Sequence, residues 1–251
     1  MTDFTEFTET GFRDLLRLLK SGGYQFARYG EGTCERHVIW RHDVDFSMHR
    51  AARLAEIEAE EGVVSTWFLN PRSAFYNLLE PEVEALTHRV LAAGHEVGLH
   101  FDGSAYSIKE WTITSLEPAI ARERKVLQTI LGREIRCLSW HNPDLSNLLS
   151  FDSEKLGGLL NAYDGRLRRD YVYCSDSNGY WRFKPMRDII AQGYPRLHLL
   201  THPEWWTPEP IAPSERIDRA ITGRSRRLRS DYDSLLRLGG RLNVTECDGE
   251  Q

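Results

Sequence analysis

The sequence contains no long hydrophobic run, and no apolar stretch approaches the roughly eighteen residues that a membrane-spanning helix needs. Its first residues are polar and acidic, without the basic region and apolar region of an export signal. We therefore expect neither a membrane span nor a signal peptide, and we expect a cytoplasmic protein.

Cysteine is scarce and widely scattered. The four cysteines, Cys34, Cys137, Cys174 and Cys247, form no CxxC pair. This spacing favours free thiols in a reducing cytoplasm over a disulfide framework. Cys137 and Cys174 lie within apolar runs, where we expect them to pack in the core.

An excess of positive charge is also missing. The chain has 32 Lys and Arg against 37 Asp and Glu, which gives a net charge of −5 and argues against a nucleic-acid-binding protein. What the sequence does have is length and apolar content. With 251 residues, of which 41% are hydrophobic, it can form one sizeable α/β domain or two small ones.

Segments with helical spacing alternate with short apolar runs along the chain. We expect helices at 9–21, 48–61, 80–93 and 113–131, and strands at 37–40 (running on to 45), 63–69, 96–101, 135–140, 171–174 and 197–201. This alternation predicts parallel βαβ units. Polar residues at the strand ends favour an α/β fold of the distorted or incomplete (β/α) barrel type over a flat sheet.

We expect a single catalytic domain over residues 1–251, with its motifs within about 37–205. An arginine-rich segment follows, and we interpret residues 212–240 as a helical C-terminal extension with a solvated basic face. Phosphate or nucleotide binding by these arginines is an alternative.

The functional interpretation of the sequence begins with the segment around Asp43 and Asp45. If residues 37–45 form a strand, alternation places both carboxylates on one side. Adjacent carboxylates repel each other, and a divalent metal relieves this repulsion when one carboxylate ligates it and the other stays free as a base. The alternative is a turn in which an aspartate caps the next helix.

Other strand ends carry polar residues of the same kind. They are His100, Asp102, His141, Asp176 and His202. Because the active sites of barrels lie at the carboxyl ends of the strands, this recurrence favours metal chemistry over simple capping. His42 and His95 do not fit the pattern, and we expect them to be structural.

Four motifs occur in order at these strand ends. They are Asp43-Val44-Asp45, Gly94-His95-Glu96-Val97-Gly98-Leu99-His100, Trp140-His141-Asn142-Pro143 and Leu199-Leu200-Thr201-His202-Pro203. The chain thereby resembles the polysaccharide deacetylases (carbohydrate esterase family four), and within them a divergent branch with a His-Asp-Val-Asp opening. The resemblance implies a distorted (β/α) barrel and a divalent metal, for which we expect Zn²⁺.

By position, the resemblance implies roles for four residues. Asp43 would be the general base that activates water, and Asp45 and His100 would be metal ligands. His202 would be the general acid that protonates the leaving amine.

The third metal ligand departs from the family pattern. The family has a histidine four residues after the position of His100, where this chain has Ser104. Hydroxyl groups are poor zinc ligands. His141 is our first candidate for the replacement, Asp102 is the second, and His202 would ligate only by leaving the acid role unfilled.

A second group of residues is expected to contact substrate. Trp205 and Trp206 would wall a sugar site, or else pack as ordinary loop tryptophans. Asp102 is placed in the same substrate-binding group. Asp176 would bind a sugar hydroxyl or orient a catalytic group, and a turn residue is the alternative.

The function that follows is a metal-dependent amide hydrolase that removes an acetyl or other acyl group from an N-acylated amino sugar. We expect a role in surface-polysaccharide or nucleotide-sugar metabolism, with a nucleotide-linked or lipid-linked sugar favoured over finished cell wall. The alternatives are hydrolysis of another non-peptide C–N bond, in a formamide or a cyclic ureide, and a degenerate barrel that binds a sugar or a partner. The pair Asp43 and Asp45, with His202, argues against the degenerate barrel.

Overall fold

The computed structural model describes residues 4–31 and 35–244. The chain divides into two compact units, Met1–Pro213 and Ser214–Gln251.

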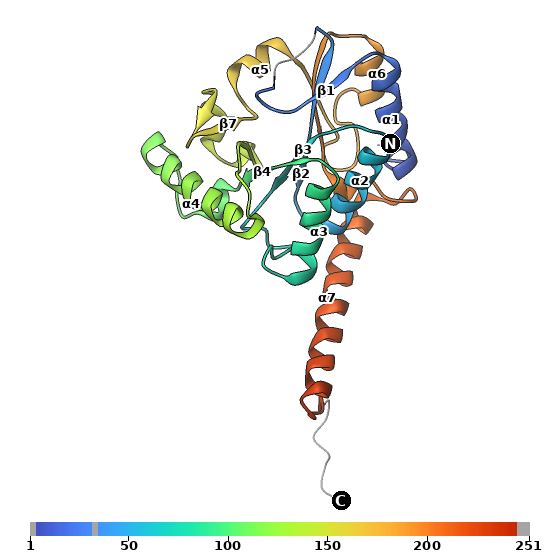
Figure 1. Cartoon of the computed structure of the whole chain (residues 1–251), viewed down its shortest axis with the longest axis vertical. Coiled ribbons are helices and arrows are strands. Elements are labelled where there is room, and N and C mark those ends of the chain that lie inside the picture. Colours follow the sequence, from blue (N-terminus) through green and yellow to red (C-terminus); the bar gives the residue numbers. More distant parts are fainter. Residues whose placement is uncertain (1–3, 32–34, 245–251) are drawn as a thin grey trace, which may run out of the picture. The chain divides into compact units, whose positions relative to one another are not determined.

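The first unit is built on one curled sheet of mostly parallel strands (Figure 1). Among the described residues the sheet has nine strands in the order β6-β7-β5-β4-β3-β2-β9-β8, with β1 paired to β2. Their bounds are β1 Gln25–Ala27, β2 His37–Val44, β3 Thr66–Leu69, β4 Glu96–Phe101, β5 Cys137–Trp140, β6 Lys155–Leu156, β7 Leu159–Asn161, β8 Val172–Ser175 and β9 Arg196–Thr201. Only β6 and β7 pair in antiparallel fashion within this part of the chain. The architecture is a half-barrel, which confirms the predicted distorted, incomplete (β/α) barrel.

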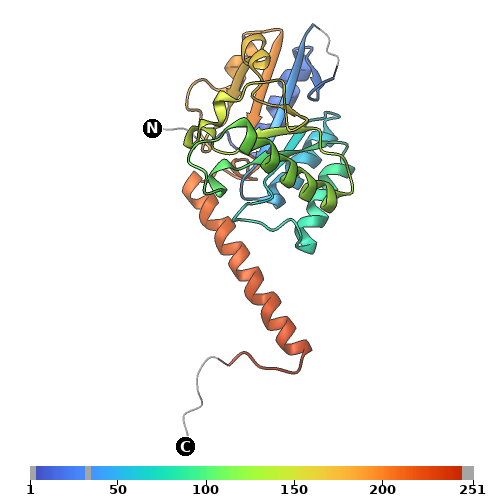
Figure 2. The same cartoon turned by 90° about the vertical axis from the view of Figure 1, so that its left-hand side faces the viewer.

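Helices alternate with the strands along the chain in the first unit. Their bounds are α1 Glu9–Ser21, α2 Met48–Glu60, α3 Pro81–Ala92, α4 Ile113–Leu131, α5 Gly165–Asp170 and α6 Met186–Ala191, with short 3-10 helices at Gly103–Ala105, Pro143–Leu145, Asn147–Ser150 and Pro203–Trp205. Helix α2 packs between α1 and α3. Figure 1 shows α4 and α1 on opposite sides of the first unit, and Figure 2 turns α4 towards the viewer.

Local sequence explains where the longer helices begin and end. The Thr8 side chain accepts a hydrogen bond from the Gly11 N–H and caps α1. Thr112 and Ser115 form a reciprocal capping box at the start of α4. Gly132 ends α4 in the left-handed conformation, which glycine adopts without steric penalty.

The predicted long helices and the predicted strands are confirmed, with boundaries that differ by a few residues. The short elements β1, β6, β7, α5 and α6 were not predicted. Each has six residues or fewer, which is too short for an apolar period to stand out from the loops around it.

Strand β2 is buried along its whole length, and its two faces contact different parts of the fold. Ile39, Arg41 and Asp43 point into the half-barrel, because Ile39 belongs to the inner core and the other two bond to inner residues. Trp40 and His42 point to the helices, where Trp40 packs against α1 and His42 bonds to α2. Alternation along the strand produces this division.

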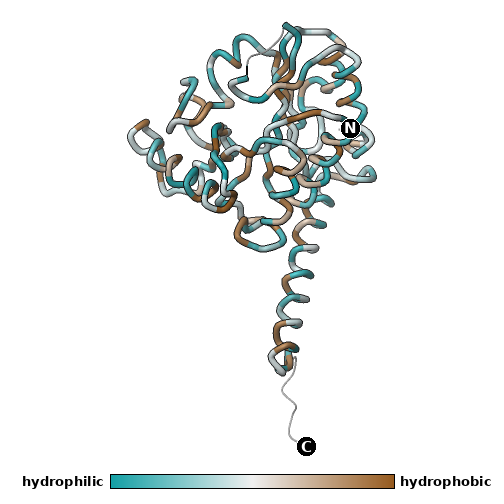
Figure 3. Tube along the Cα trace, viewed as in Figure 1, coloured by the Kyte–Doolittle hydropathy of each residue, from teal (hydrophilic) through white to brown (hydrophobic). Residues whose placement is uncertain are grey.

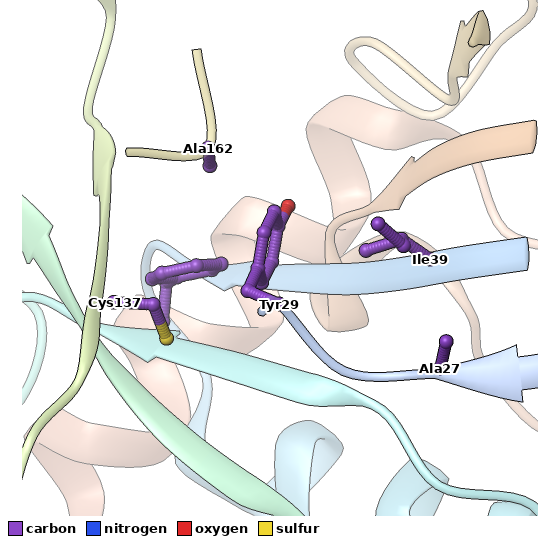
Figure 4. Packing of buried hydrophobic residues seen from close by; sticks show 6 residues of the cluster. Ala27, Tyr29, Ile39, Cys137 and Ala162 are labelled. Carbon is purple, nitrogen blue, oxygen red and sulfur yellow. The ribbon is translucent and has the colours of Figure 1, made fainter. Parts of the chain in front are cut away.

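The bottom of the half-barrel is filled by a hydrophobic cluster. Its members are Ala27, Tyr29, Ile39, Phe68, Cys137 and Ala162, and Figure 4 shows their side chains converging from several strands. A Cβ atom on Gly98 would lie 2.5 Å from the Phe68 ring and 2.9 Å from Cys137 Sγ, so the neighbouring side chains require glycine here.

The cysteine prediction is confirmed where it can be examined. Cys137 and Cys174 are free and buried. Cys34 and Cys247 lie outside the described residues.

Helix α7, Pro213–Leu238, makes up most of the described part of the second unit and lies close to the predicted extension. Hydrophilic and hydrophobic residues alternate along it (Figure 3). Among the described residues, no helix is both long enough and apolar enough to cross a membrane.

Candidate active site

Three potential metal ligands converge at the carboxyl ends of neighbouring strands. Asp45 follows β2, His100 lies near the end of β4, and His141 follows β5. Asp45 Oδ1 is 3.2 Å from His100 Nε2 and 3.1 Å from His141 Nδ1, and these two nitrogens are 3.2 Å apart. Within residues 4–31 and 35–244, this is the one group of three or more His, Cys, Asp and Glu side chains whose ligand atoms lie so close together.

The geometry of this triad fits a divalent cation. Zinc–ligand distances of about 2.0–2.1 Å in a tetrahedral site place the ligand atoms about 3.3 Å from one another. The three separations of 3.1–3.2 Å lie close to that value. Two imidazoles and one carboxylate are also a donor set that zinc and similar metals accept. Asp45 and His141 remain about one-fifth exposed, so the site is open on one side.

A hydrogen-bond chain behind His100 fixes its orientation. His100 pairs with Ser139 in the β4–β5 register, and its Nδ1 lies 2.7 Å from Ser139 Oγ. The Ser139 hydroxyl donates to Asp43 Oδ1 at 3.3 Å, so it accepts from His100 Nδ1–H. With a metal in the site, Nε2 of His100 would be unprotonated, and its lone pair would be directed towards the space between Asp45 and His141, as metal ligation requires.

Electrostatics of the triad also favour a cation. Burial alone would raise the pKa of Asp45, but hydrogen bonds from His100 and His141 and the charges of His202 and His100 together lower it. Burial alone would lower the pKa of His141, but the hydrogen bond and charge of Asp45, with the charges of Asp102 and Asp43, together raise it. Without a metal, positive charge is therefore drawn to this point, and a bound cation would compete with protons for His141.

Asp43 lies beside the triad and is almost completely buried. Its Oδ2 is 3.4 Å from Nη2 of Arg41, which is buried as well and also donates to the Tyr163 hydroxyl at 2.9 Å. Burial disfavours the charged guanidinium, but Asp43 compensates and the pKa of Arg41 is raised above its ordinary value. Arg41 thus supplies the counter-charge that a buried Asp43 carboxylate needs.

His202 follows β9 and is paired with a buried carboxylate. Its Nδ1 donates to Asp176 Oδ1 at 2.6 Å, and its backbone N–H donates to Asp176 Oδ2 at 2.8 Å. Burial would lower the pKa of His202, but the charge and hydrogen bond of Asp176 raise it to about 10. Burial raises the pKa of Asp176, and His202 partly offsets this effect. At neutral pH His202 therefore carries two protons.

The structure corrects the expected substrate contacts of Asp176 and Trp206. Asp176 is fully buried, and its oxygens are engaged by His202 and by Trp206 Nε1, which donates at 3.0 Å. Trp206 is buried against Phe7 and Phe12. Neither side chain has a surface left for a sugar, because N-terminal residues pack over Trp206. The alternative that Asp176 orients a catalytic group agrees with this placement.

Trp205 is buried too, with 5% of its surface exposed, and it packs edge-on against Phe46. Its expected role as a wall of the sugar site is corrected to a supporting role beneath Phe46.

Asp102 and Ser104 lie outside the triad. Asp102 Oδ1 accepts hydrogen bonds from the backbone N–H and the hydroxyl of Ser104, at 2.9 and 2.6 Å. Ser104 thus takes part in a local turn with Asp102, whereas His141 lies beside His100. Asp102 is half-buried, and its substrate contact remains a prediction.

Sequence reasoning missed three residues at the site. Arg41 and Ser139 lie two residues before Asp43 and His141, so strand alternation was a signal for both. Glu204 is buried with no hydrogen-bond partner for either carboxylate oxygen among the described residues. Burial, and then the charge of Asp45, raise the pKa of Glu204 well above its ordinary value. No sequence signal points to this burial.

No protein-family model matches the chain, and no curated protein matches it. Among solved structures, the chain is similar to a family 4 acetyl xylan esterase from Clostridium thermocellum in complex with a cobalt ion, with 18% identity, a TM-score of 0.44, and coverage of 76% of this chain and 84% of the esterase. It is similar to a carbohydrate esterase family 4 (CE4) esterase from Streptococcus mutans, with 14% identity, a TM-score of 0.46, and coverage of 85% and 83%. A CE4 pseudoenzyme from Bacillus anthracis matches at 13% identity with a TM-score of 0.41, over 80% of this chain and 64% of the pseudoenzyme.

Proposed function

We propose that this chain is a divalent-metal-dependent amide hydrolase that removes an acetyl or other acyl group from an N-acylated amino sugar. The observation that carries the proposal is the triad of Asp45, His100 and His141, with ligand atoms 3.1–3.2 Å apart. A buried carboxylate, Asp43, and a protonated imidazole, His202, belong to the same end of the half-barrel.

When bound, the cation would polarise the amide carbonyl and lower the pKa of a water molecule. Asp43 then accepts the proton that the attacking water loses. Arg41 and Ser139 hold the Asp43 carboxylate on two sides, which restricts its rotation and favours proton transfer in one direction.

His202 donates a proton to the departing nitrogen, because an amine leaves poorly as an anion. Asp176 bonds to Nδ1, so the other ring nitrogen, Nε2, carries the proton that is transferred. The buried Asp176 carboxylate also stabilises the imidazolium until the proton leaves.

The domain organisation, the metal, the location and the substrate class are parts of the same proposal. We infer one catalytic domain with the helical extension at its C-terminal end, Zn²⁺ as the metal, and a cytoplasmic role in surface-polysaccharide or nucleotide-sugar metabolism. The substrate is a small molecule or glycan with an N-acylated amino sugar, including nucleotide-linked or lipid-linked forms.

The test is release of acetate from a panel of N-acetylated amino sugars by zinc-loaded and cobalt-loaded protein. Asp43→Asn and His202→Ala should each reduce kcat by at least about 100-fold while metal binding is retained. His49→Ala, a substitution of an exposed histidine, is the control and should match the wild type. Acetate release that survives in both Asp43→Asn and His202→Ala would overturn the assigned roles.

A further inference from the structure

An aromatic cluster is attached to the strand end that carries Asp45. Phe46 follows Asp45 in the chain, and its ring centroid is 5.4 Å from that of Phe75 and 5.4 Å from that of Trp205. Exposure rises through the cluster, from 5% for Trp205 through the half-buried Phe46 to 39% for Phe75. The cluster thus forms a supported apolar surface whose outermost ring, Phe75, faces solvent.

The loop that carries Phe75 is tied to the strand end that carries Asp45. The Ser73 hydroxyl donates to the backbone carbonyl of Asp45 at 3.1 Å and accepts from the backbone N–H of Phe75 at 3.1 Å. The position of the Phe75 ring relative to the triad is therefore set by short, direct hydrogen bonds.

A second tie comes from the next residue. The Tyr76 hydroxyl donates to the Val44 carbonyl at 2.9 Å and accepts from the Asn70 N–H at 2.8 Å. Tyr76 is buried, so this tie is shielded from water. A ring that is held in place before binding loses little conformational entropy when a ligand covers it.

We propose that Phe75, supported by Phe46, binds the C–H face of the pyranose ring that carries the scissile amide. This inference rests on the proposed function, since the amide is placed at Asp45. A pyranose has an apolar face and hydroxyl groups at its edge, so it covers an exposed flat ring while the hydroxyls stay in water. A long acyl chain would need an enclosed apolar groove instead, and Phe75 is too exposed to form one.

The experiment measures binding and hydrolysis of an N-acetylglucosamine oligosaccharide by metal-loaded full-length protein, using calorimetry for Kd and acetate release for KM and kcat. Phe75→Ala should raise Kd and KM on the order of tenfold and change kcat less than about twofold, because the ring contacts ground state and transition state alike. Phe75→Tyr keeps a flat aromatic ring and should restore binding. Phe183→Ala removes a more exposed phenylalanine and should bind as the wild type does.

Two further substrates separate the sugar from the acyl group. For an acyclic N-acetyl amide, Phe75→Ala should match the wild type, because no pyranose is present. A tenfold effect on an acyclic N-hexanoyl amide would overturn the proposal in favour of an acyl-chain site. Equal Kd for the oligosaccharide in wild type and Phe75→Ala would also overturn it.

The binding measurement separates this inference from the proposed function. If the wild type binds the oligosaccharide without hydrolysing it, and Phe75→Ala loses binding, the hydrolase proposal fails and the sugar surface stands. If hydrolysis occurs and Phe75→Ala binds normally, the hydrolase stands and the sugar surface fails.

Discussion

Histidine and carboxylate side chains cluster on both faces of strand β2, but the two clusters differ in burial and in hydrogen bonding. On the helix side, His42 Nε2 lies 2.9 Å from Glu58 Oε1, Ser65 bonds to the other Glu58 oxygen, and His95 bonds to Ser65. Every member of this outer cluster is buried. Histidine and carboxylate here form a closed network with its hydrogen bonds satisfied.

On the inner face, the histidine and carboxylate side chains are not enclosed by such a network and are partly exposed to solvent. Asp45, His100 and His141 direct their ligand atoms at one another, and two of the three side chains remain partly exposed. The difference teaches that residue type alone does not define a site. Convergent ligand atoms with access from solvent distinguish the inner cluster from the outer one, which we expect to stabilise the fold without taking part in chemistry.

The largest expected effect comes from removing a triad ligand. Asp45→Ala leaves two imidazoles with no carboxylate, and we expect kcat/KM to fall by at least about 1,000-fold, since the cation is then lost. Acetate release measures this effect, and circular dichroism should show an intact fold. A variant that unfolds would contradict the comparison, because the inner cluster would then be structural.

Asp176→Asn should reduce kcat by about 100-fold and change its pH dependence. The acid form of His202 is the active one, so activity persists below the folded pKa of about 10 and falls as pH rises through it. Without the Asp176 charge this pKa falls towards the ordinary value, and the alkaline decline moves to lower pH. A pH–rate profile checks this shift, and an unmoved alkaline limb would argue that another group is the acid.

Glu58→Gln tests the outer cluster. It removes the charge that pairs with His42, and we expect the free energy of unfolding to fall by about 3 kcal/mol, since breaking a buried pair leaves its partner uncompensated. Urea denaturation measures this loss. Metal binding below the unfolding transition should match the wild type, and loss of the metal in a folded Glu58→Gln protein would show that the two faces are coupled.

Ser139→Ala should have the smallest effect of these substitutions, and it tests whether the orientation of His100 contributes to metal affinity. The hydroxyl orients His100 from behind, and its removal should weaken metal affinity by about tenfold. Competition with a chromogenic chelator measures the change. Ser115→Ala, on the surface of α4, is the control and should leave affinity unchanged.

The sequence was informative wherever a period ran through a long element. Alternation along β2 was sufficient to place Asp43 and Asp45 together, and the strand-to-helix alternation predicted the half-barrel. The convergence of His141 with His100 follows from adjacent parallel strands, β4 and β5.

Other features depend on contacts between distant segments and have no local signal. Trp206 is buried because Phe7, about 200 residues earlier in the chain, packs against it. Trp206 Nε1 in turn donates to Asp176, the partner of His202, so this burial also holds the His202 pair in place. The support of Phe75 by Ser73 and Tyr76 likewise requires the folded loop.

The most direct test of the account is the metal content of purified protein, measured by elemental analysis after zinc loading and dialysis. We predict about one metal per chain in the wild type and in the His49→Ala control, and none in His141→Ala. Equal metal content in His141→Ala and wild type would contradict the central claim, as would a wild-type protein that binds no zinc, cobalt or nickel.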